Sequence, residues 1–176
     1  ASFHCESPMP PAEILANLRR YLPEDIGIYS CREVSARFHA RLNAREKTYV
    51  YRIWNSEAPC VFERRFVTVM PERLDVEAMN RAGALLVGRH DFSAFCGNPK
   101  MKKSTVRELT ALTVTRQGEE IVLRFTGNGF LYNMVRILTG TLVEVGRQQR
   151  SPESVTELFG AKRAQAGFLA PAQGLC

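Results

Sequence analysis

The chain has 176 residues, 45% of them hydrophobic and 24% charged, and its 24 Lys and Arg exceed its 18 Asp and Glu, for a net charge of +6. This composition is that of a globular protein with a buried core, and it excludes a disordered or fibrous chain. The longest apolar stretch, residues 130–145, is interrupted by Asn133, Arg136 and Glu144 and falls short of the roughly 20 apolar residues of a membrane span.

Cysteine and histidine are placed in ways that give no sign of a metal site. The five cysteines are scattered and include no Cys-x-x-Cys pair, so neither a disulfide framework nor a zinc site is expected. The three histidines have no ligand-like spacing from one another or from a cysteine. Scattered cysteines fit a reducing compartment, and we expect a cytoplasmic protein that binds no metal.

The first 36 residues are predicted to form a strand, a helix and a second strand. Residues 1–5 and 26–34 have the composition of strands, and residues 12–21 follow two prolines with leucines at helical spacing. Residues 37–47 are rich in arginine and are interpreted as a basic connector.

From residue 48 onward the pattern predicts the order strand, helix, strand, strand, helix. β-Branched and aromatic residues favour the strands, a Gln-Gly pair marks a hairpin turn, and Asp75 is a candidate helix N-cap. A loop with a short edge strand is expected at residues 59–70, and a short helix after Pro152. The main elements are expected as a strand at 48–54, a helix between Asp75 and Gly88, strands at 106–116 and 121–126, and a helix from about 130 to 145.

This order is that of a split, ferredoxin-like β-α-β-β-α-β unit without its last strand. The expected fold class is α+β, with an antiparallel sheet and helices packed on one side. The chain starts without a methionine in a strand-like segment, so we expect a piece truncated at both ends. In this interpretation residues 1–36 are the remnant of an N-terminal α+β half, residues 37–47 are the connector, and residues 48–176 are the C-terminal half.

The positive charge is concentrated in two segments. Residues 37–65 contain seven Lys and Arg against three Glu, and residues 100–107 contain four Lys and Arg and no acidic residue, so the rest of the chain is slightly acidic. Such segments are typical of a surface that binds a polyanion such as RNA, and they are equally compatible with two solvated loops.

The helix predicted at residues 130–145 is apolar on all faces and should be buried, yet it contains Arg136. A buried guanidinium is unfavourable unless a carboxylate pairs with it. Glu144 lies eight residues further on, about 12 Å along the axis, which is too far for an ion pair. Arg136 therefore either needs an anion from elsewhere, or reaches the surface or binds backbone carbonyls.

Tyr49 and Tyr51 share one face of their predicted strand. Core packing is the usual role of an aromatic residue in that position, and we assign it to Tyr51. Tyr49 adjoins the basic connector, so its hydroxyl could open onto a cleft.

His90 and Asp91 form a second candidate pair. Adjacent residues of an extended chain point apart, whereas in a turn Asp91 can cap the backbone of residues 92–95. A structural role is therefore favoured over catalysis, and a hydrolase that uses this pair would lack a nucleophile motif.

Five motifs are similar, in order and in approximate spacing, to the tRNA pseudouridine synthase A family. Together they extend over nearly the whole chain, which makes the resemblance more specific than any one motif. They are Phe-His-Ala-Arg at 38–41, Lys-Thr-Tyr-Val-Tyr at 47–51, Gly-Arg-His-Asp-Phe-Ser-Ala-Phe at 88–95, Asn-Gly-Phe-Leu-Tyr-Asn-Met-Val-Arg at 128–136, and Ala-Pro-Ala-Gln-Gly-Leu at 170–175.

The resemblance implies the pseudouridine synthase fold and the isomerisation of uridine to pseudouridine in the anticodon stem and loop of tRNA, by a homodimer and without a cofactor. In the family an Asp in a Gly-Arg-Thr-Asp-Ala-Gly motif attacks the flipped nucleotide, a Tyr stacks on the base and is proposed to take the C5 proton, and an Arg pairs with the Asp. Tyr49 matches the Tyr and Arg136 matches the Arg. The Asp motif is absent and by the family's spacing would precede Ala1, so the chain is expected to be inactive alone.

The resemblance also implies two RNA contacts, and no residue matches the basic side chain that assists base flipping in some members. An alternative function is a non-catalytic RNA-binding module of sheet-and-helix type, which would need exposed stacking aromatics on its sheet. The implied contacts are Phe38, His39, Ala40, Arg41 and Leu42 in one segment, and Pro99, Lys100, Met101, Lys102 and Lys103 in the other.

Overall fold

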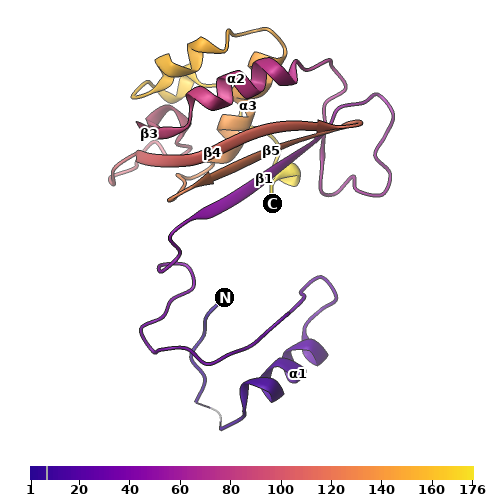
Figure 1. Cartoon of the computed structure of the whole chain (residues 1–176), viewed down its shortest axis with the longest axis vertical. Coiled ribbons are helices and arrows are strands. Elements are labelled where there is room, and N and C mark those ends of the chain that lie inside the picture. The colour runs from indigo at the N-terminus through magenta and orange to yellow at the C-terminus, as the bar shows by residue number, and fades with distance from the viewer. Residues whose placement is uncertain (7) are drawn as a thin grey trace. The chain divides into compact units, whose positions relative to one another are not determined.

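The computed structural model describes residues 1–6 and 8–176. The chain divides into two compact units, Ala1–Arg45 and Glu46–Cys176, and each is described by itself (Figure 1). The division falls inside the segment 37–47 that we expected to be a connector.

Among the described residues of the smaller unit, helix α1 (Pro11–Tyr21) forms at the place predicted from the leucine spacing. No strand forms among residues 1–6 and 8–45, so the strands predicted at 1–5 and 26–34 are wrong. A strand needs a neighbour for its backbone hydrogen bonds, and here the contact is made by a side chain instead. Nε and Nη2 of Arg19 donate to the carbonyl oxygens of Ile28 and Tyr29, at 2.9 and 3.0 Å.

The larger unit is built on a five-stranded sheet with helices on one side, which confirms the predicted α+β class (Figure 1). The strand order is β2-β1-β5-β4-β3, and all pairs are antiparallel except β1 with β2. The strands are β1 (Lys47–Trp54), β2 (Thr68–Val69), β3 (Gly88–Asp91), β4 (Val106–Gln117) and β5 (Glu120–Gly127), and the α-helices are α2 (Val76–Leu85) and α3 (Met134–Gly146).

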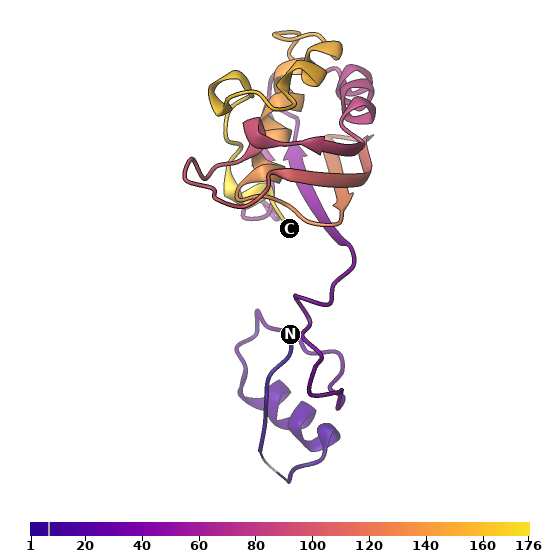
Figure 2. The ribbon, with the colours of Figure 1, turned by 90° about the vertical axis from the view of Figure 1, so that its left-hand side faces the viewer.

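The order β1, α2, β4, β5, α3 agrees with the predicted split unit, and β5 lies between β1 and β4 as that unit requires. The last residues return from the helical layer to the sheet (Figure 2). There Val50 and Cys176 exchange two backbone hydrogen bonds of 2.8 Å, and Tyr51 bridges to Leu175. These residues lie on the side of β1 that the last strand of a complete unit occupies, so the chain ends where that strand was predicted to be missing.

β3 is a strand where a turn was expected. Gly88 to Asp91 pair with Leu109 to Val106 at the start of β4. The four residues of β3 show no alternation of apolar and polar side chains, so the sequence pattern alone does not predict a strand. The strand forms because β4 is longer than β5, and its first residues are free to pair with β3. Short 3₁₀ helices complete the unit: η1 (Ser93–Phe95), η2 (Glu153–Leu158), η3 (Arg163–Gln165) and η4 (Ala172–Gly174).

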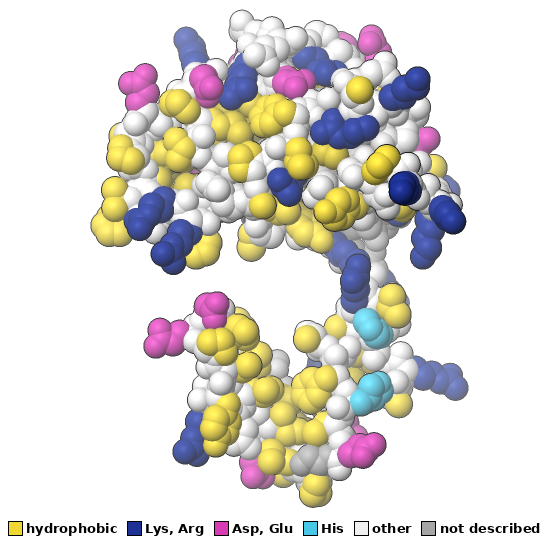
Figure 3. Space-filling model, turned by 180° about the vertical axis from the view of Figure 1, so that it is seen from behind, with side chains coloured by type: hydrophobic (Ala, Val, Ile, Leu, Met, Phe, Trp, Pro, Cys, Tyr) yellow, Lys and Arg dark blue, Asp and Glu magenta, His cyan; other side chains and the backbone are white. Residues whose placement is uncertain are grey.

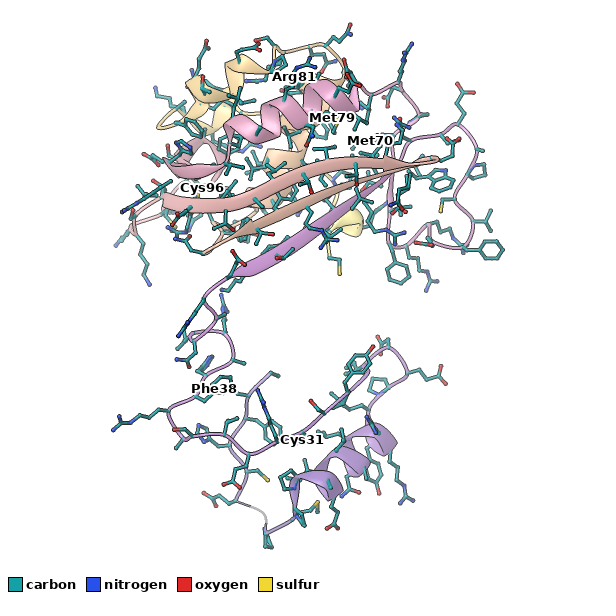
Figure 4. All side chains as sticks on the ribbon, in the orientation of Figure 1. Cys31, Phe38, Met70, Met79, Arg81 and Cys96 are labelled. Carbon is teal, nitrogen blue, oxygen red and sulfur yellow. The ribbon has the colours of Figure 1, made fainter. Side chains whose placement is uncertain are left out.

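The core lies between the sheet and the two helices. Ile121, Leu123 and Phe125 alternate along β5 and are fully buried. Met79 of α2, labelled in Figure 4, is buried in the same core. Every residue of α3 is buried except Arg136 and Glu144.

The helix predicted to begin near residue 130 begins at Met134. Asn133 has a φ of 59°, in the left-handed region, which separates the preceding turn from the helix. No helix within residues 1–6 and 8–176 has the length and apolar character of a membrane span.

Candidate active site

Arg136 lies in the first turn of α3 and is half-buried. Its Nε donates a hydrogen bond of 2.6 Å to the carbonyl of Ala170, and the Ala170 N–H donates one of 3.2 Å to the Arg136 carbonyl. Nη1 lies 3.5 Å from Oδ1 of Asn133. The guanidinium and the positive end of the helix dipole therefore come together, and this combination favours a bound anion.

The described residues place no carboxylate within ion-pairing distance of Arg136. Glu144 pairs instead with Arg150 at 3.2 Å and accepts the Phe168 N–H at 3.2 Å, which confirms that it is not the partner of Arg136. From the sequence alone, Arg136 could pair with an anion from elsewhere, reach the surface or bind backbone carbonyls. Nε has the carbonyl partner, while for Nη2 the structure gives no hydrogen bond to any described residue.

Tyr49 is half-buried on β1, with its ring edge against Phe130 in the turn that precedes α3. The ring centroids are 5.0 Å apart and the ring planes meet at 84°. Its hydroxyl makes no hydrogen bond to the described residues. The aromatic contact fixes the ring at the same end of α3 that holds Arg136.

Tyr51 is fully buried, as the sequence predicts, but its hydroxyl makes contacts that the sequence did not reveal. The hydroxyl donates to the carbonyl of Pro171 at 2.7 Å and lies 2.8 Å from Oγ1 of Thr68. Burial raises the pKa of Tyr51, and the Thr68 hydrogen bond and the positive charge of Arg136 partly oppose the rise. Tyr51 is thus within electrostatic reach of Arg136.

The closing segment, residues 168–176, passes close to both α3 and β1. A Cβ on Gly140 would lie 1.9 Å from the carbonyl oxygen of Phe168, so only glycine permits this approach to α3. A Cβ on Gly174 would lie 2.8 Å from Oγ1 of Thr68 and from Cε1 of Tyr51. The closing segment can approach α3 and β1 this closely because positions 140 and 174 have no side chain.

The first implied RNA contact, Phe38 to Leu42, lies in the smaller unit, where Figure 4 labels Phe38. The ring Nδ1 of His39 accepts the N–H groups of Arg41 and Leu42 at 3.3 and 3.2 Å, which folds the segment into a turn around Ala40. Phe38 and Leu42 are 42% and 78% exposed, so the turn presents apolar surface to solvent.

The second implied RNA contact, residues 99–103, is a loop of the larger unit between η1 and β4. Met101 packs against the core, and Asn98 accepts the Lys100 and Met101 N–H groups through Oδ1 and its carbonyl, at 3.0 and 3.2 Å. Lys100, Lys102 and Lys103 are exposed on this anchored loop. Figure 3 shows Lys and Arg side chains spread over one face of the same unit.

Asp91 has the structural role that the sequence favours. Its Oδ1 accepts the Ser93 N–H at 3.0 Å and the Thr105 hydroxyl at 2.6 Å, and thereby ties the first residue of η1 to the residue before β4. His90 stacks on Phe159, with ring centroids 3.9 Å apart. Asp91 is thus held by hydrogen bonds and His90 by ring stacking, which fits the structural role favoured over catalysis.

Within residues 1–6 and 8–176 the structure contains no group of three or more His, Cys, Asp or Glu side chains placed to hold a metal ion.

Comparison with known proteins places the chain in one family. A family model described as "tRNA pseudouridine synthase" matches residues 82–176, which include Arg136 and the closing segment. A relative from Bacillus anthracis named "tRNA pseudouridine synthase A 2" is 42% identical over 99% of this chain and 72% of its own length. A relative of the same name from Clostridium tetani is 39% identical over 99% of this chain and 71% of its length. From Halalkalibacterium halodurans, "tRNA pseudouridine synthase A" is 43% identical over 90% of this chain and 60% of its length.

The chain therefore belongs to the tRNA pseudouridine synthase family, a family of isomerases. The resemblance seen in the five motifs is confirmed, and with it the assignment of the larger unit's sheet to the pseudouridine synthase fold.

Proposed function

We propose that this chain carries the tyrosine and the arginine of an active site that converts uridine to pseudouridine in the anticodon stem and loop of tRNA. The observation that supports this most directly is Arg136, half-buried at the positive end of α3, held by Ala170 and without a carboxylate partner among the described residues. A site of this kind requires an anion, and the nucleophilic aspartate of the family is an anion.

The aspartate is proposed to come from the part of the relatives' length that this chain does not match, since the Gly-Arg-Thr-Asp-Ala-Gly motif occurs nowhere in the 176 residues. The reaction breaks the bond between uracil N1 and ribose C1′ and forms a bond from C5 to C1′. C5 loses its proton and N1 gains one, so the atoms balance without a redox cofactor. Arg136 would hold the aspartate as its carboxylate, and Tyr49 would stack on the base and take the C5 proton.

Uridine must leave its stacked position to reach Tyr49, because a base inside a helix presents only its edges. The two implied contact segments, residues 38–42 and 99–103, are proposed to bind the tRNA backbone around the extruded nucleotide. Their Arg and Lys side chains suit phosphates, which fix the position of the RNA more than they read its sequence. The exposed Phe38 and Leu42 would pack against a ribose or a base of the bound tRNA.

We further propose that the intact enzyme is a cytoplasmic homodimer whose subunits share one tRNA. In this proposal residues 1–36 belong to the N-terminal half of the catalytic domain and residues 48–176 form the C-terminal half, joined by residues 37–47.

The test is tritium release from tRNA that carries [5-³H]uridine, because the C5 hydrogen is lost only when the isomerisation proceeds. We expect the native-length protein, meaning one that also contains the proposed aspartate motif, to release tritium. In that protein Arg136→Ala should lower the rate by about 100-fold or more, since one preorganised charged contact has effects of that order. Tyr49→Phe keeps the contact with Phe130 and removes the hydroxyl, so it separates stacking from proton transfer.

Tyr132→Phe, at an exposed tyrosine beside Asn133, is the matched control for removal of a hydroxyl and should release tritium at the native rate. A native rate for Arg136→Ala would overturn the proposed site. A native rate for Tyr49→Phe would exclude Tyr49 as the base while leaving its stacking role.

A further inference from the structure

We propose that Tyr51 is a positioning residue for Arg136: its hydroxyl holds the Ala170–Pro171 segment, and this segment in turn sets the direction of the guanidinium. The inference rests on the proposed role of Arg136. It goes beyond that role because it assigns a function to a buried tyrosine and to the closing segment, neither of which contacts the substrate in the proposed reaction.

The hydrogen bonds at Tyr51 have a defined direction. A tyrosine hydroxyl has one proton, and the carbonyl of Pro171 can only accept, so Tyr51 donates to Pro171 at 2.7 Å. The Thr68 hydroxyl, 2.8 Å away, must then donate to the tyrosine oxygen. Thr68 is 4% exposed, so water does not compete for this contact. Two successive hydrogen bonds therefore connect β2, β1 and the closing segment: Thr68 donates to Tyr51, and Tyr51 donates to Pro171.

The hydrogen bonds at Arg136 begin at the next residue of the same segment. Ala170, the residue before Pro171, accepts Nε of Arg136 at 2.6 Å and donates its N–H to the Arg136 carbonyl at 3.2 Å. Pro171 has no N–H, so its carbonyl is the one backbone group through which this residue can be held by a hydrogen bond. Tyr51 thus acts on the peptide group next to the one that holds Nε.

Packing leaves this arrangement little freedom to adjust. Ala170 is fully buried, and Gly174 approaches Tyr51 so closely that a Cβ would lie 2.8 Å from the ring. Leu175 bridges to Tyr51 in the sheet. With Nε fixed on Ala170, the Nη groups keep one orientation, and this orientation is the one offered to the anionic partner. Loss of the Tyr51 hydroxyl would release the carbonyl of Pro171 without opening a cavity.

The experiment compares Tyr51→Phe with wild type in two measurements. In the 176-residue chain, the exchange rate of the Arg136 Nε proton is followed by ¹H–¹⁵N NMR. It should rise several-fold when the Pro171 carbonyl is no longer held and the Ala170–Pro171 segment can move. In the native-length protein, kcat for tRNA isomerisation should fall by about tenfold, the effect of removing one hydrogen bond, with KM for tRNA unchanged. Thr68→Val should also raise the exchange rate and lower kcat, each by a smaller factor than Tyr51→Phe.

Val155→Ala, a buried truncation on η2, controls for a general loss of stability and should change neither measurement. Unchanged exchange of the Arg136 Nε proton in both Tyr51→Phe and Thr68→Val would overturn the inference. So would an unchanged kcat in Tyr51→Phe when Arg136→Ala is inactive. If Arg136→Ala keeps its turnover, the proposed function fails, and the exchange measurement still decides whether Tyr51 positions Arg136.

Discussion

At the scale of single residues, Tyr49 and Tyr51 show how position on one strand separates two chemical roles. They lie on the same face of β1, two residues apart. Tyr51 is enclosed by β2 and the closing segment and has its hydroxyl satisfied twice, whereas Tyr49 is half-buried and its hydroxyl makes no hydrogen bond to the described residues. A base or a stacking group must contact the substrate, so we propose that role for Tyr49 and the holding of other groups for the enclosed Tyr51.

The raised pKa of Tyr51 predicts a specific loss of stability at alkaline pH. Burial raises its pKa above the ordinary value of 10.0, so the folded chain holds the phenol proton more tightly than the unfolded chain does. The stabilising contribution is complete below pH 10 and is lost as the pH rises from there through the folded-state pKa.

Urea unfolding of wild type and Tyr51→Phe at a series of pH values checks this expectation. The free energy of unfolding of the wild type should fall more steeply above pH 10, by up to about 1.4 kcal/mol per pH unit relative to Tyr51→Phe. Parallel curves for the two proteins would show that Tyr51 ionises in the folded state as it does in the unfolded state.

At the scale of elements, the close approach of α3 to the closing segment depends on Gly140. Alanine at a helical position without contacts would stabilise the helix by about 1 kcal/mol, because glycine is a poor helix former. Here the added Cβ would lie 1.9 Å from the Phe168 carbonyl oxygen, so the backbone must move. We expect Gly140→Ala to destabilise the chain by about 1–3 kcal/mol, measured by urea unfolding.

Gly129→Ala is the matched control, since its Cβ would meet only the Arg107 side chain at 3.8 Å, an ordinary contact. It should change the free energy of unfolding by less than about 0.5 kcal/mol. A Gly140→Ala chain as stable as wild type would mean that the closing segment is free to move away from α3, and the proposed positioning of Arg136 through Ala170 would lose its support.

The elements that the sequence predicts well are those with a periodic pattern. Alternation in β1 and β5, the hairpin between β4 and β5, and the Asp75 cap, which accepts the Ala78 N–H at 2.9 Å, follow from local chemistry. β3 lacks alternation and exists because β4 extends beyond β5. Strand-like residues 1–5 and 26–34 have the composition without the neighbour, so no ladder forms among the described residues of that unit.

In the candidate site, too, the features that local sequence determines could be predicted, and those that depend on long-range packing could not. Arg136 is conspicuous in the sequence because a charge in an apolar helix needs a partner, and Tyr49 is identified by its match to the family motif. The hydroxyl contacts of Tyr51 could not be predicted, because they join residues 17 and 120 positions apart. Such contacts depend on how the closing segment crosses the sheet, and this crossing is fixed by packing at Gly140 and Gly174.

At the scale of the whole molecule, the excess positive charge is carried by segments in both units. Residues 38–42 belong to the smaller unit and residues 99–103 to the larger one. The larger unit holds Tyr49 and Arg136, so the proposed chemistry and one proposed RNA contact share a single core. An RNA that binds both segments would contact both units at once, and its affinity would depend on each.

The lysine loop offers the most direct test of RNA binding by the larger unit. Each phosphate that a protein binds releases counterions, so the logarithm of the binding constant falls with the logarithm of the salt concentration in proportion to the number of bound phosphates. Converting Lys100, Lys102 and Lys103 to alanine should weaken tRNA binding and lower this slope by about 0.7–0.9 for each phosphate that the variant no longer binds. Met101 stays in place, so the loop keeps its anchor on the core.

Lys162→Ala, at an exposed lysine outside the loop, should leave the slope unchanged. Equal slopes for the triple variant and wild type would assign residues 99–103 to a solvated loop that does not meet the RNA.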